Sequence, residues 1–324
     1  MNEPVLLISG LEVTFRVAGR RRLRAVAGVD LSVGSGEIVA LVGESGSGKT
    51  TLGRCVLGLQ EPTAGAVSVR GSRGRRDRYR YVQPVFQDPY SSLDPRWPVR
   101  RTIREALDAQ RIGTPAQREA RVDELLGEVG LHSDLGGRLP RELSGGQRQR
   151  VAIAAALAPG PQLIVADEPV SALDMLVQAQ VLNLVDGLRA QFGLAILFIT
   201  HDLAVVRHLA DRVAVMYLGQ IVEEGTVGEV FDEPRHPYTR ALLDAHPAAD
   251  PSQPLDPPRL TAEIPDPTDP PAGCAFHPRC PVAIDRCRSE RPQLVSFGGR
   301  QAAACHVAAA AIGSQTPASP ITPT

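Results

Sequence analysis

The sequence predicts an α/β protein whose core is a sheet of buried parallel strands, with an added antiparallel β layer and a small cysteine-containing module near the C-terminal end. Helical patterns alternate with short apolar runs along the middle of the chain, which is typical of parallel strands covered by helices. Further β-rich segments lie before and after this alternating region. Four of the five cysteines fall within residues 274–305.

The first elements are strands. Residues 5–42 contain the apolar segments VLLISGLEVTF, VDLSV and EIVALVG, and the last of them ends in glycine. A helix is expected over 49–59, and RYVQPVF predicts another strand.

The middle of the chain alternates between helices and strands. Between about 98 and 130 the apolar residues from Val122 to Val129 follow the i, i+3, i+4, i+7 spacing of one helix face. The helix QRVAIAAALA precedes the strand QLIVAD, and a helix over 175–192 precedes the strand LAILFIT. A short helix then leads to the strands RVAVMYLG and QIVEEG.

Composition narrows the class of protein. Hydrophobic residues make up 43% and charged residues 22%, which is ordinary for a globular protein, and the net charge of −1 creates no overall field for polyanions. The N-terminal residues lack the features of a secretory signal, and no stretch reaches the roughly 18 apolar residues of a membrane span. We therefore expect a cytoplasmic chain in which thiols stay reduced.

The composition changes in the last quarter of the chain. Residues 247–271 hold nine prolines in 25 positions and predict an extended linker. The cysteine module is expected over 272–308, and a disordered tail over 309–324.

The clearest motif is LVGESGSGKTT, which fits G-x-x-x-x-G-K-[ST] between an apolar strand and a helix. Its glycines let successive N–H groups surround phosphates, and the helix N-terminus adds positive potential. Lys49, the one lysine against 34 arginines, would bridge the β- and γ-phosphates, and the Thr50 hydroxyl would bind Mg²⁺. The alternative is a glycine-rich turn without a ligand. This phosphate loop comprises Gly43, Glu44, Ser45, Gly46, Ser47, Gly48, Lys49, Thr50 and Thr51.

Two carboxylates follow the apolar strand in LIVADEP. Asp167 would hold Mg²⁺, directly or through water, and Glu168 would orient or deprotonate an attacking water. His201 follows another strand end and would donate a hydrogen bond to the γ-phosphate and tie it to Glu168. The alternatives are a solvated acidic turn and an ordinary helix cap at THD.

A second helix start lies in ELSGGQRQR. Ser144 and two glycines lead into a helix near Gln147, which makes a second anion-binding helix N-terminus. One chain needs only one phosphate-binding site for its nucleotide. A second such site therefore favours two chains that face each other head to tail, each binding the nucleotide of its partner. The alternative is an ordinary capped helix.

Together these motifs resemble the nucleotide-binding subunits of ATP-binding cassette (ABC) transporters, in the expected order over about residues 5–245. FQDPYSSLDPR (86–96), HPYTRALLDAHP (236–247) and the trailing cysteines resemble the oligopeptide/dipeptide importer ATPases, which include nickel-type relatives. The resemblance implies a P-loop NTPase cassette over 1–246, with a RecA-like core, an antiparallel β subdomain and a helical subdomain at about 88–158.

The resemblance implies further residue roles. Phe15 would stack on adenine, although a core phenylalanine is the alternative, and Gln87 would reach Mg²⁺ and water. The LSGGQ signature would act across the dimer, and the D-loop SALD would cross the interface near Glu168. Residues 90–96 would lie near the groove for the transmembrane subunit. The signature and D-loop residues are Leu143, Ser144, Gly145, Gly146 and Gln147, and Ser171, Ala172, Leu173 and Asp174.

The clustered cysteines are Cys274, Cys280, Cys287 and Cys305, separated by 5, 6 and 17 residues. Zinc ribbons usually use tight C-x₂-C pairs, whereas a [4Fe–4S] cluster tolerates wider spacing. Spacing alone leaves a cluster, zinc and plain reduced thiols open. Resemblance to the peptide importers implies a [4Fe–4S] cluster with a structural role.

The resemblance also implies a function and partners. It implies an ATPase that drives import of di- or oligopeptides, with nickel or another small solute as the alternative. The partners would be a second ABC ATPase subunit, identical or different, two transmembrane permease subunits and, indirectly, an extracytoplasmic solute-binding protein. The chain would then be peripheral, at the cytoplasmic face of the cell membrane.

A soluble cassette ATPase acting on DNA or ribosomes is a third possibility. Lys49 and Ser144 are only 95 positions apart, which leaves no room for the long coiled coil of DNA-repair types. Translation types carry two cassettes in one chain, and the basic runs here lack interleaved stacking aromatics. We therefore expect no nucleic-acid partner.

Overall fold

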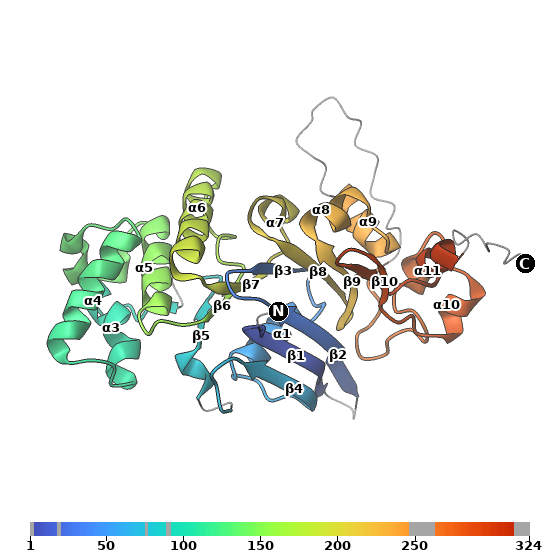
Figure 1. The fold of residues 1–324 in the computed structure, drawn as a ribbon, viewed down its shortest axis with the longest axis horizontal. Coiled ribbons are helices and arrows are strands. Elements are labelled where there is room, and N and C mark those ends of the chain that lie inside the picture. The colour runs from blue at the N-terminus through green and yellow to red at the C-terminus, as the bar shows by residue number, and fades with distance from the viewer. Residues whose placement is uncertain (1–2, 18–20, 75–76, 89–91, 246–262, 314–324) are drawn as a thin grey trace, which may run out of the picture.

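The computed structural model describes residues 3–17, 21–74, 77–88, 92–245 and 263–313. Figure 1 shows a helical region at one end, a central sheet in the middle and the C-terminal module at the other end. None of the helices in these ranges is long and apolar enough to cross a membrane.

The central sheet has eight strands in the order β10-β11-β9-β8-β3-β7-β6-β5. The strands β5, β6, β7, β3 and β8 run parallel, which confirms the predicted α/β core, whereas β9, β11 and β10 extend it antiparallel. Their bounds are β3 Ile38–Val42, β5 Val82–Val85, β6 Leu163–Asp167, β7 Ala195–Ile199, β8 Arg212–Tyr217, β9 Gln220–Thr226, β10 Val295–Gly298 and β11 Gln301–Ala303.

A second, antiparallel sheet in the order β2-β1-β4 confirms the added β layer. Helix α1 (Lys49–Val56) lies between this sheet and the central one, because its buried Leu52, Cys55 and Val56 belong to an apolar cluster with residues of both sheets. The strands of the second sheet are β1 Leu6–Arg16, β2 Arg22–Val33 and β4 Ala64–Val69.

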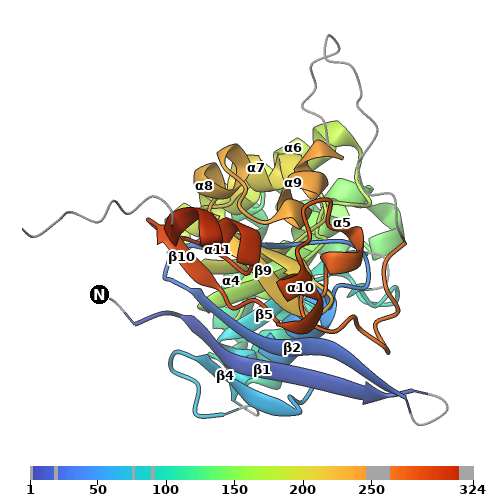
Figure 2. The ribbon, with the colours of Figure 1, turned by 90° about the vertical axis from the view of Figure 1, so that its right-hand side faces the viewer.

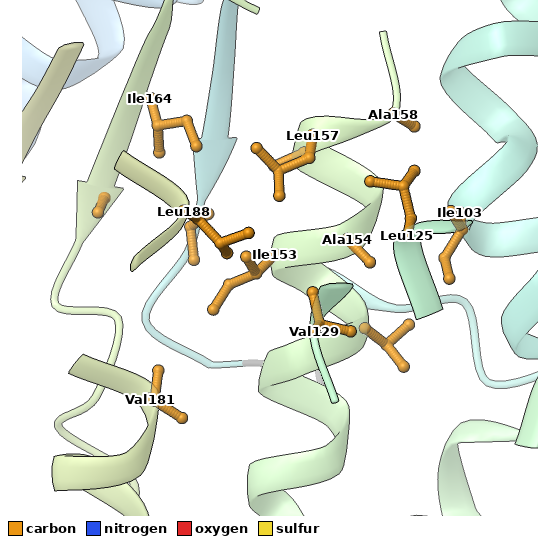
Figure 3. Packing of buried hydrophobic residues seen from close by; sticks show 14 of the residues in the cluster. Ile103, Leu125, Val129, Ile153, Ala154, Leu157, Ala158, Ile164, Val181 and Leu188 are labelled. Carbon is orange, nitrogen blue, oxygen red and sulfur yellow. The ribbon is translucent and has the colours of Figure 1, made fainter. Parts of the chain in front are cut away.

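The helical region contains α3 (Val99–Ala109), α4 (Pro115–Glu128) and α5 (Gly145–Leu157), with short 3₁₀ turns η3 (Ser133–Gly137) and η4 (Pro140–Glu142). Its apolar faces meet in one buried cluster that continues to the sheet and to α6, as Figure 3 shows. Leu125 is fully buried there, so the helix face expected from the spacing is the one that packs.

The other helices cover the face of the central sheet opposite α1, as Figure 1 shows. The predicted helix over 175–192 is α6, with the same bounds. The helices of this layer are α6 Met175–Phe192, α7 Leu203–Leu209, α8 Val227–Asp232 and α9 Pro237–Asp244, and a 3₁₀ turn η2 Arg78–Arg80 precedes β5.

The C-terminal module consists of η5 (His277–Arg279), α10 (Asp285–Ser289), the hairpin β10–β11 and α11 (His306–Gly313). It is joined to the core because β11 pairs with β9, and Figure 2 views the molecule from this side.

The C-terminal region is more helical than the sequence predicts. The tail was expected to be without structure from residue 309, but α11 continues to Gly313, because its alanine run favours a helix. Residues 314–324 and the first part of the expected linker, 247–262, lie outside the described residues, and 263–271 form neither helix nor strand.

Candidate active site

The phosphate loop runs between β3 and α1, and two of its glycines are required by close backbone approaches. Gly43 has φ 148° and Gly48 has φ 107°, values that favour glycine. A Cβ atom on Gly43 would lie 2.1 Å from the carbonyl oxygen of Met216, and one on Gly48 would lie 2.1 Å from that of Ala25. The sequence therefore folds here into a loop that tolerates no larger residue at either position.

Lys49 begins α1 and is buried against this loop. Its Nζ donates to the carbonyl oxygens of Gly43 at 2.7 Å and Glu44 at 2.9 Å. Burial lowers the pKa of Lys49, and the nearby carboxylates of Glu168 and Asp167 partly oppose that shift. The ammonium group is thus held inside the loop, where an incoming phosphate would offer it a charged acceptor.

Asp167 ends β6 and faces the start of α1. The Thr50 hydroxyl donates to Asp167 Oδ1 at 3.4 Å. Burial raises the pKa of Asp167, and Glu168 adds to that rise, while the bond from Thr50 opposes it. A hydroxyl and a carboxylate are oxygen ligands that suit Mg²⁺, which would favour the ionised form of Asp167.

Glu168 follows with its backbone in the left-handed region, at φ 48°, which is uncommon for a non-glycine residue. Its N–H donates to the carbonyl oxygen of Ile199 on β7 at 2.8 Å. Its carboxylate accepts from Gln87 Nε2 at 2.9 Å through Oε2 and lies 2.9 Å from His201 Nδ1 through Oε1. The turn therefore aims the Glu168 carboxylate at two side chains from other strand ends.

One cavity of about 530 Å³ collects most of the predicted residues. Phe15, half-buried on β1, lies on its wall, so this residue is accessible to a ligand there. An adjoining cavity of about 320 Å³ shares Glu168 and reaches the D-loop at Ser171 and Ala172. The predicted residues on the wall of the larger cavity are Phe15, Ser45, Gly46, Gly48, Lys49, Thr50, Thr51, Gln87, Asp167, Glu168 and His201.

The signature turn does not line this cavity in the same chain. Ser144 is the N-cap of α5 and forms a reciprocal capping box with Gln147: the Gln147 N–H donates to the Ser144 hydroxyl, and the Ser144 N–H donates to Gln147 Oε1. Gly146 packs against α6, because a Cβ atom there would lie 2.5 Å from Val177 Cγ1. The helix start is therefore well formed, and both interpretations of it, a cap and an anion site, stay compatible with its geometry.

The D-loop connects Glu168 to α6. The Ser171 hydroxyl donates to the Glu168 carbonyl oxygen at 3.1 Å, and Asp174 caps α6 by accepting from the Val177 N–H at 3.0 Å. Of the segment 90–96 expected near the transmembrane subunit, residues 90–91 lie outside the described residues.

Sequence reasoning missed two contacts with the phosphate loop. The Glu44 N–H donates to the hydroxyl of Tyr238 on α9 at 2.9 Å, and the guanidinium of Arg279 forms a two-bond ion pair with the Glu44 carboxylate. Both partners come from nearly 200 residues or more away in the chain, so no local pattern could have indicated them.

The four clustered cysteines influence one another. Burial raises the pKa of Cys274 to about 11, and the thiols of Cys287, Cys280 and Cys305 raise it as well. In the ranges that the structure describes, however, no group of three or more His, Cys, Asp or Glu side chains is arranged as ligands for a metal ion. The predictions of a [4Fe–4S] cluster or zinc therefore remain unconfirmed.

Comparisons with known proteins agree with this geometry. Residues 26–171 match the family model "ABC transporter", and residues 222–287 match "Oligopeptide/dipeptide transporter, C-terminal region". YkfD of Bacillus subtilis (strain 168) is 46% identical over 316 residues, covering 94% of this chain and 95% of its own. The oligopeptide transport ATP-binding protein AppF of the same organism is 45% identical over 295 residues, covering 88% of this chain and 90% of its own.

A solved structure shares the fold. It is the ATP-binding cassette MJ0796, in a dimeric post-hydrolysis state bound to ADP and Pi, and the two chains superpose with a TM-score of 0.62 at 29% identity. The match covers 68% of this chain and 98% of that one. With its phosphate loop, Glu168 turn and signature helix in this fold, the chain belongs to the ATP-binding subunits of ABC transporters, in the oligopeptide/dipeptide family.

Proposed function

We propose that this ABC ATPase drives the import of di- or oligopeptides through separate membrane subunits. The observation that carries the proposal is the Glu168 carboxylate, held between Gln87 and His201 in the same cavity as Lys49. A carboxylate so fixed can take a proton from a water molecule, and the buried ammonium can stabilise charge on a transferring phosphoryl group. The arrangement suits ATP hydrolysis to ADP and phosphate.

Each residue has a specific part in this scheme. Thr50, Gln87 and Asp167 would hold Mg²⁺, which when bound neutralises phosphate charge. Phe15 would stack on the adenine ring at the β1 wall. His201 would orient the Glu168 carboxylate and donate a hydrogen bond to the γ-phosphate.

The signature turn Leu143–Gln147 would act on a nucleotide held by a facing subunit. It lies outside the cavity of its own chain and starts a helix of 13 residues, whose N-terminus favours an anion. The D-loop, Ser171–Asp174, would contact the same interface, because it connects directly to Glu168. Closure of the two subunits would then complete each active site and pull on the membrane subunits.

The peptide cargo is supported by the relatives rather than by a site on this chain. AppF carries oligopeptide transport in its name, and the C-terminal match is to oligopeptide/dipeptide transporters. The assembly would contain a second ABC ATPase subunit, two permease subunits and, indirectly, an extracytoplasmic solute-binding protein. It would place this chain at the cytoplasmic face of the cell membrane.

Uptake by cells tests the cargo. Cells lacking this gene should lose uptake of radiolabelled di- and tripeptides and regain it with the intact gene but not with Glu168→Gln. Nickel uptake is measured in the same cells. Loss of nickel uptake with peptide uptake unchanged would reject a peptide importer in favour of a metal importer.

We also propose that Cys274, Cys280, Cys287 and Cys305 hold a [4Fe–4S] cluster. Burial raises the pKa of Cys274 to about 11 and raises the pKa values of Cys280 and Cys305 as well, and cationic iron beside these thiols would favour their ionised form. Protein purified without oxygen should contain iron and acid-labile sulfide in equal amounts and a broad visible absorption band. Zinc without sulfide, or four titratable thiols and no metal, would reject the cluster.

A further inference from the structure

Glu44, in the phosphate loop, is held at all of its polar groups. Its N–H donates to the hydroxyl of Tyr238 at 2.9 Å, and its carbonyl oxygen accepts from Lys49 Nζ at 2.9 Å. Its carboxylate oxygens accept from the two terminal nitrogens of Arg279, Nη1 to Oε2 at 2.8 Å and Nη2 to Oε1 at 2.9 Å. This paired geometry is the strong form of an arginine–carboxylate contact.

Arg279 reaches this position from the C-terminal module. Its side chain is only 4% exposed, and its guanidinium lies 5.8 Å from the ring centre of Tyr217 and 5.9 Å from that of Phe276. Its Nη1 is also 3.4 Å from the Tyr217 hydroxyl oxygen. Contact with two aromatic rings leaves the guanidinium little freedom to move away from Glu44.

The backbone of Arg279 is fixed by the cysteine segment. The Arg279 N–H donates to the Phe276 carbonyl oxygen at 3.0 Å, and the next residue is Cys280. Both the N–H and the ring Nδ1 of His277 contact the carbonyl oxygen of Cys274, at 3.0 and 2.9 Å. The turn that aims Arg279 at the phosphate loop is therefore built on two of the four clustered cysteines.

We propose that Arg279 is a positioning residue for the phosphate loop, and that through it the C-terminal cysteine module sets the nucleotide affinity of the ATPase site. This rests on the proposed role of the loop in binding ATP. When Lys49 turns from the Glu44 carbonyl oxygen toward a phosphate, the loop loses one of its internal bonds. The contacts of Glu44 with Arg279 and Tyr238 do not depend on Lys49 and keep the loop in its binding shape.

The physical reason for a large effect is burial. Removing Arg279 would leave the Glu44 carboxylate, whose side chain is 24% exposed, without its charged partner, so the loop would move to hydrate that carboxylate more fully. A loop that spends only part of its time in the binding shape has an apparent affinity lowered by that fraction. The Glu168 carboxylate has no contact with Arg279 among those described, so the chemical step itself should change little.

The test is a double-mutant cycle in the full-length chain, with affinity measured by displacement of a fluorescent ATP analogue. Arg279→Met, which keeps side-chain volume but loses the charge, should weaken ATP binding about tenfold. The ATP affinity of Arg279→Lys should lie between those of the unsubstituted chain and Arg279→Met, because one ammonium group cannot bind both carboxylate oxygens in the paired geometry. In a Glu44→Gln background, Arg279→Met should add little, since the pair is already broken.

A matched control comes from the same module. Arg286 pairs with Glu290 at 2.7 Å on the exposed surface of α10, so Arg286→Met removes an arginine without touching the loop and should leave ATP affinity unchanged. In steady-state assays Arg279→Met should raise KM with kcat little changed, a split that general destabilisation would not produce.

The results of these measurements distinguish a positioning role of Arg279 from a purely structural one, and both from the absence of a nucleotide site. Unchanged ATP affinity in Arg279→Met and Arg279→Lys, with only the unfolding temperature lowered, would make Arg279 a purely structural residue and overturn the inference. If Glu44→Gln and Arg279→Lys lower ATP affinity by amounts that simply add, the two residues act independently, and the inference is also overturned. This comparison can be made even if Arg279→Met fails to fold. Absence of ATP binding by the unsubstituted chain would instead remove the proposed nucleotide site itself.

Discussion

Nδ1 of His201 lies 2.9 Å from Oε1 of Glu168, although the two residues are 33 positions apart in the chain. The contact follows from the sheet, because β6 and β7 are parallel neighbours and each residue comes just after the end of its strand. Carboxyl ends of parallel strands meet at one edge, where α/β proteins bind their ligands. The pair therefore lies at the ligand-binding edge of the sheet, on the wall of the cavity that also contains Lys49.

Glu168→Gln should abolish turnover while leaving nucleotide binding intact. The amide keeps the size of the side chain but cannot accept a proton, so phosphate release should fall by about 10²- to 10⁴-fold. Because ATP is bound but not split, the variant should accumulate as ATP-bound dimers on size-exclusion chromatography. Asp134→Asn, on the exposed η3 turn, is the control. An unchanged rate for Glu168→Gln would remove this residue from the mechanism.

His201→Ala should lower kcat by about 10²-fold and change KM less, because the imidazole positions the carboxylate rather than holding the base or sugar. His208 provides a matched control, since it lies exposed on α7 only seven residues away and outside the cavity. Phosphate release by His208→Ala should equal that of the unsubstituted chain. Equal losses in the two variants would indicate damage to α7 instead of a catalytic contact.

Ser144→Ala tests the action of the signature turn across two subunits. Loss of the cap should lower the free energy of unfolding by about 1 kcal/mol. Thr114→Ala breaks a capping box of the same type, with Gln117 at the start of α4, and should cost a similar amount. Only Ser144→Ala should also lower ATP turnover, by about 10²-fold. Equal turnover in both variants would show that Ser144 is merely a cap.

The buried imidazole of His236 should make the folded chain less stable in acid. Burial lowers the pKa of its imidazole to about 3, so the folded chain keeps it neutral while the unfolded chain protonates it below about 6.5. Its stabilising contribution is therefore present above about 6.5 and is lost as the pH falls from there toward 3, by up to about 1.4 kcal/mol for each pH unit.

The variant His236→Asn isolates this effect, because asparagine also accepts the Tyr238 N–H bond that caps α9 but does not titrate in this range. Urea unfolding at a series of pH values should show a shallower acid dependence for His236→Asn. Exposed His132, replaced by Asn, should not alter the slope. A slope unchanged by His236→Asn would mean that another group controls the acid sensitivity.

The sequence indicates most of the residues that line the cavity, because each motif is local. Gly43 to Thr51 form one continuous segment, the loop before α1 and its first turn, and Asp167 and Glu168 stand at the end of one apolar strand, β6, that pairs in parallel with its neighbours. The order of strands then brings the motifs together without any further information. The expected fold class and the ATPase assignment are confirmed for the same reason.

Contacts that span the whole chain could not be predicted in this way. Arg279 is one of 34 arginines, and nothing in its neighbours indicates that it pairs with a residue 235 positions earlier. The pairing of β11 with β9 could not be predicted either, because β11 has only three residues, Gln301–Ala303, and these show no clear strand pattern. The predicted disordered tail, 309–324, begins inside α11, because the position of this segment near the C-terminal end outweighed the helix propensity of its alanines in the prediction.

The joining of β11 to β9 has a consequence for shortened versions of the protein. Ala302 and Ala303 occupy the outer side of β9 opposite Glu224 and Glu223, and the Ala304 N–H bonds to the Val222 carbonyl oxygen at 2.8 Å. A chain that ends before the module would leave the backbone N–H and C=O groups on this edge of β9 unpaired, and they could then pair with a strand of another molecule. Truncation would therefore yield a self-associating fragment instead of an isolated motor domain.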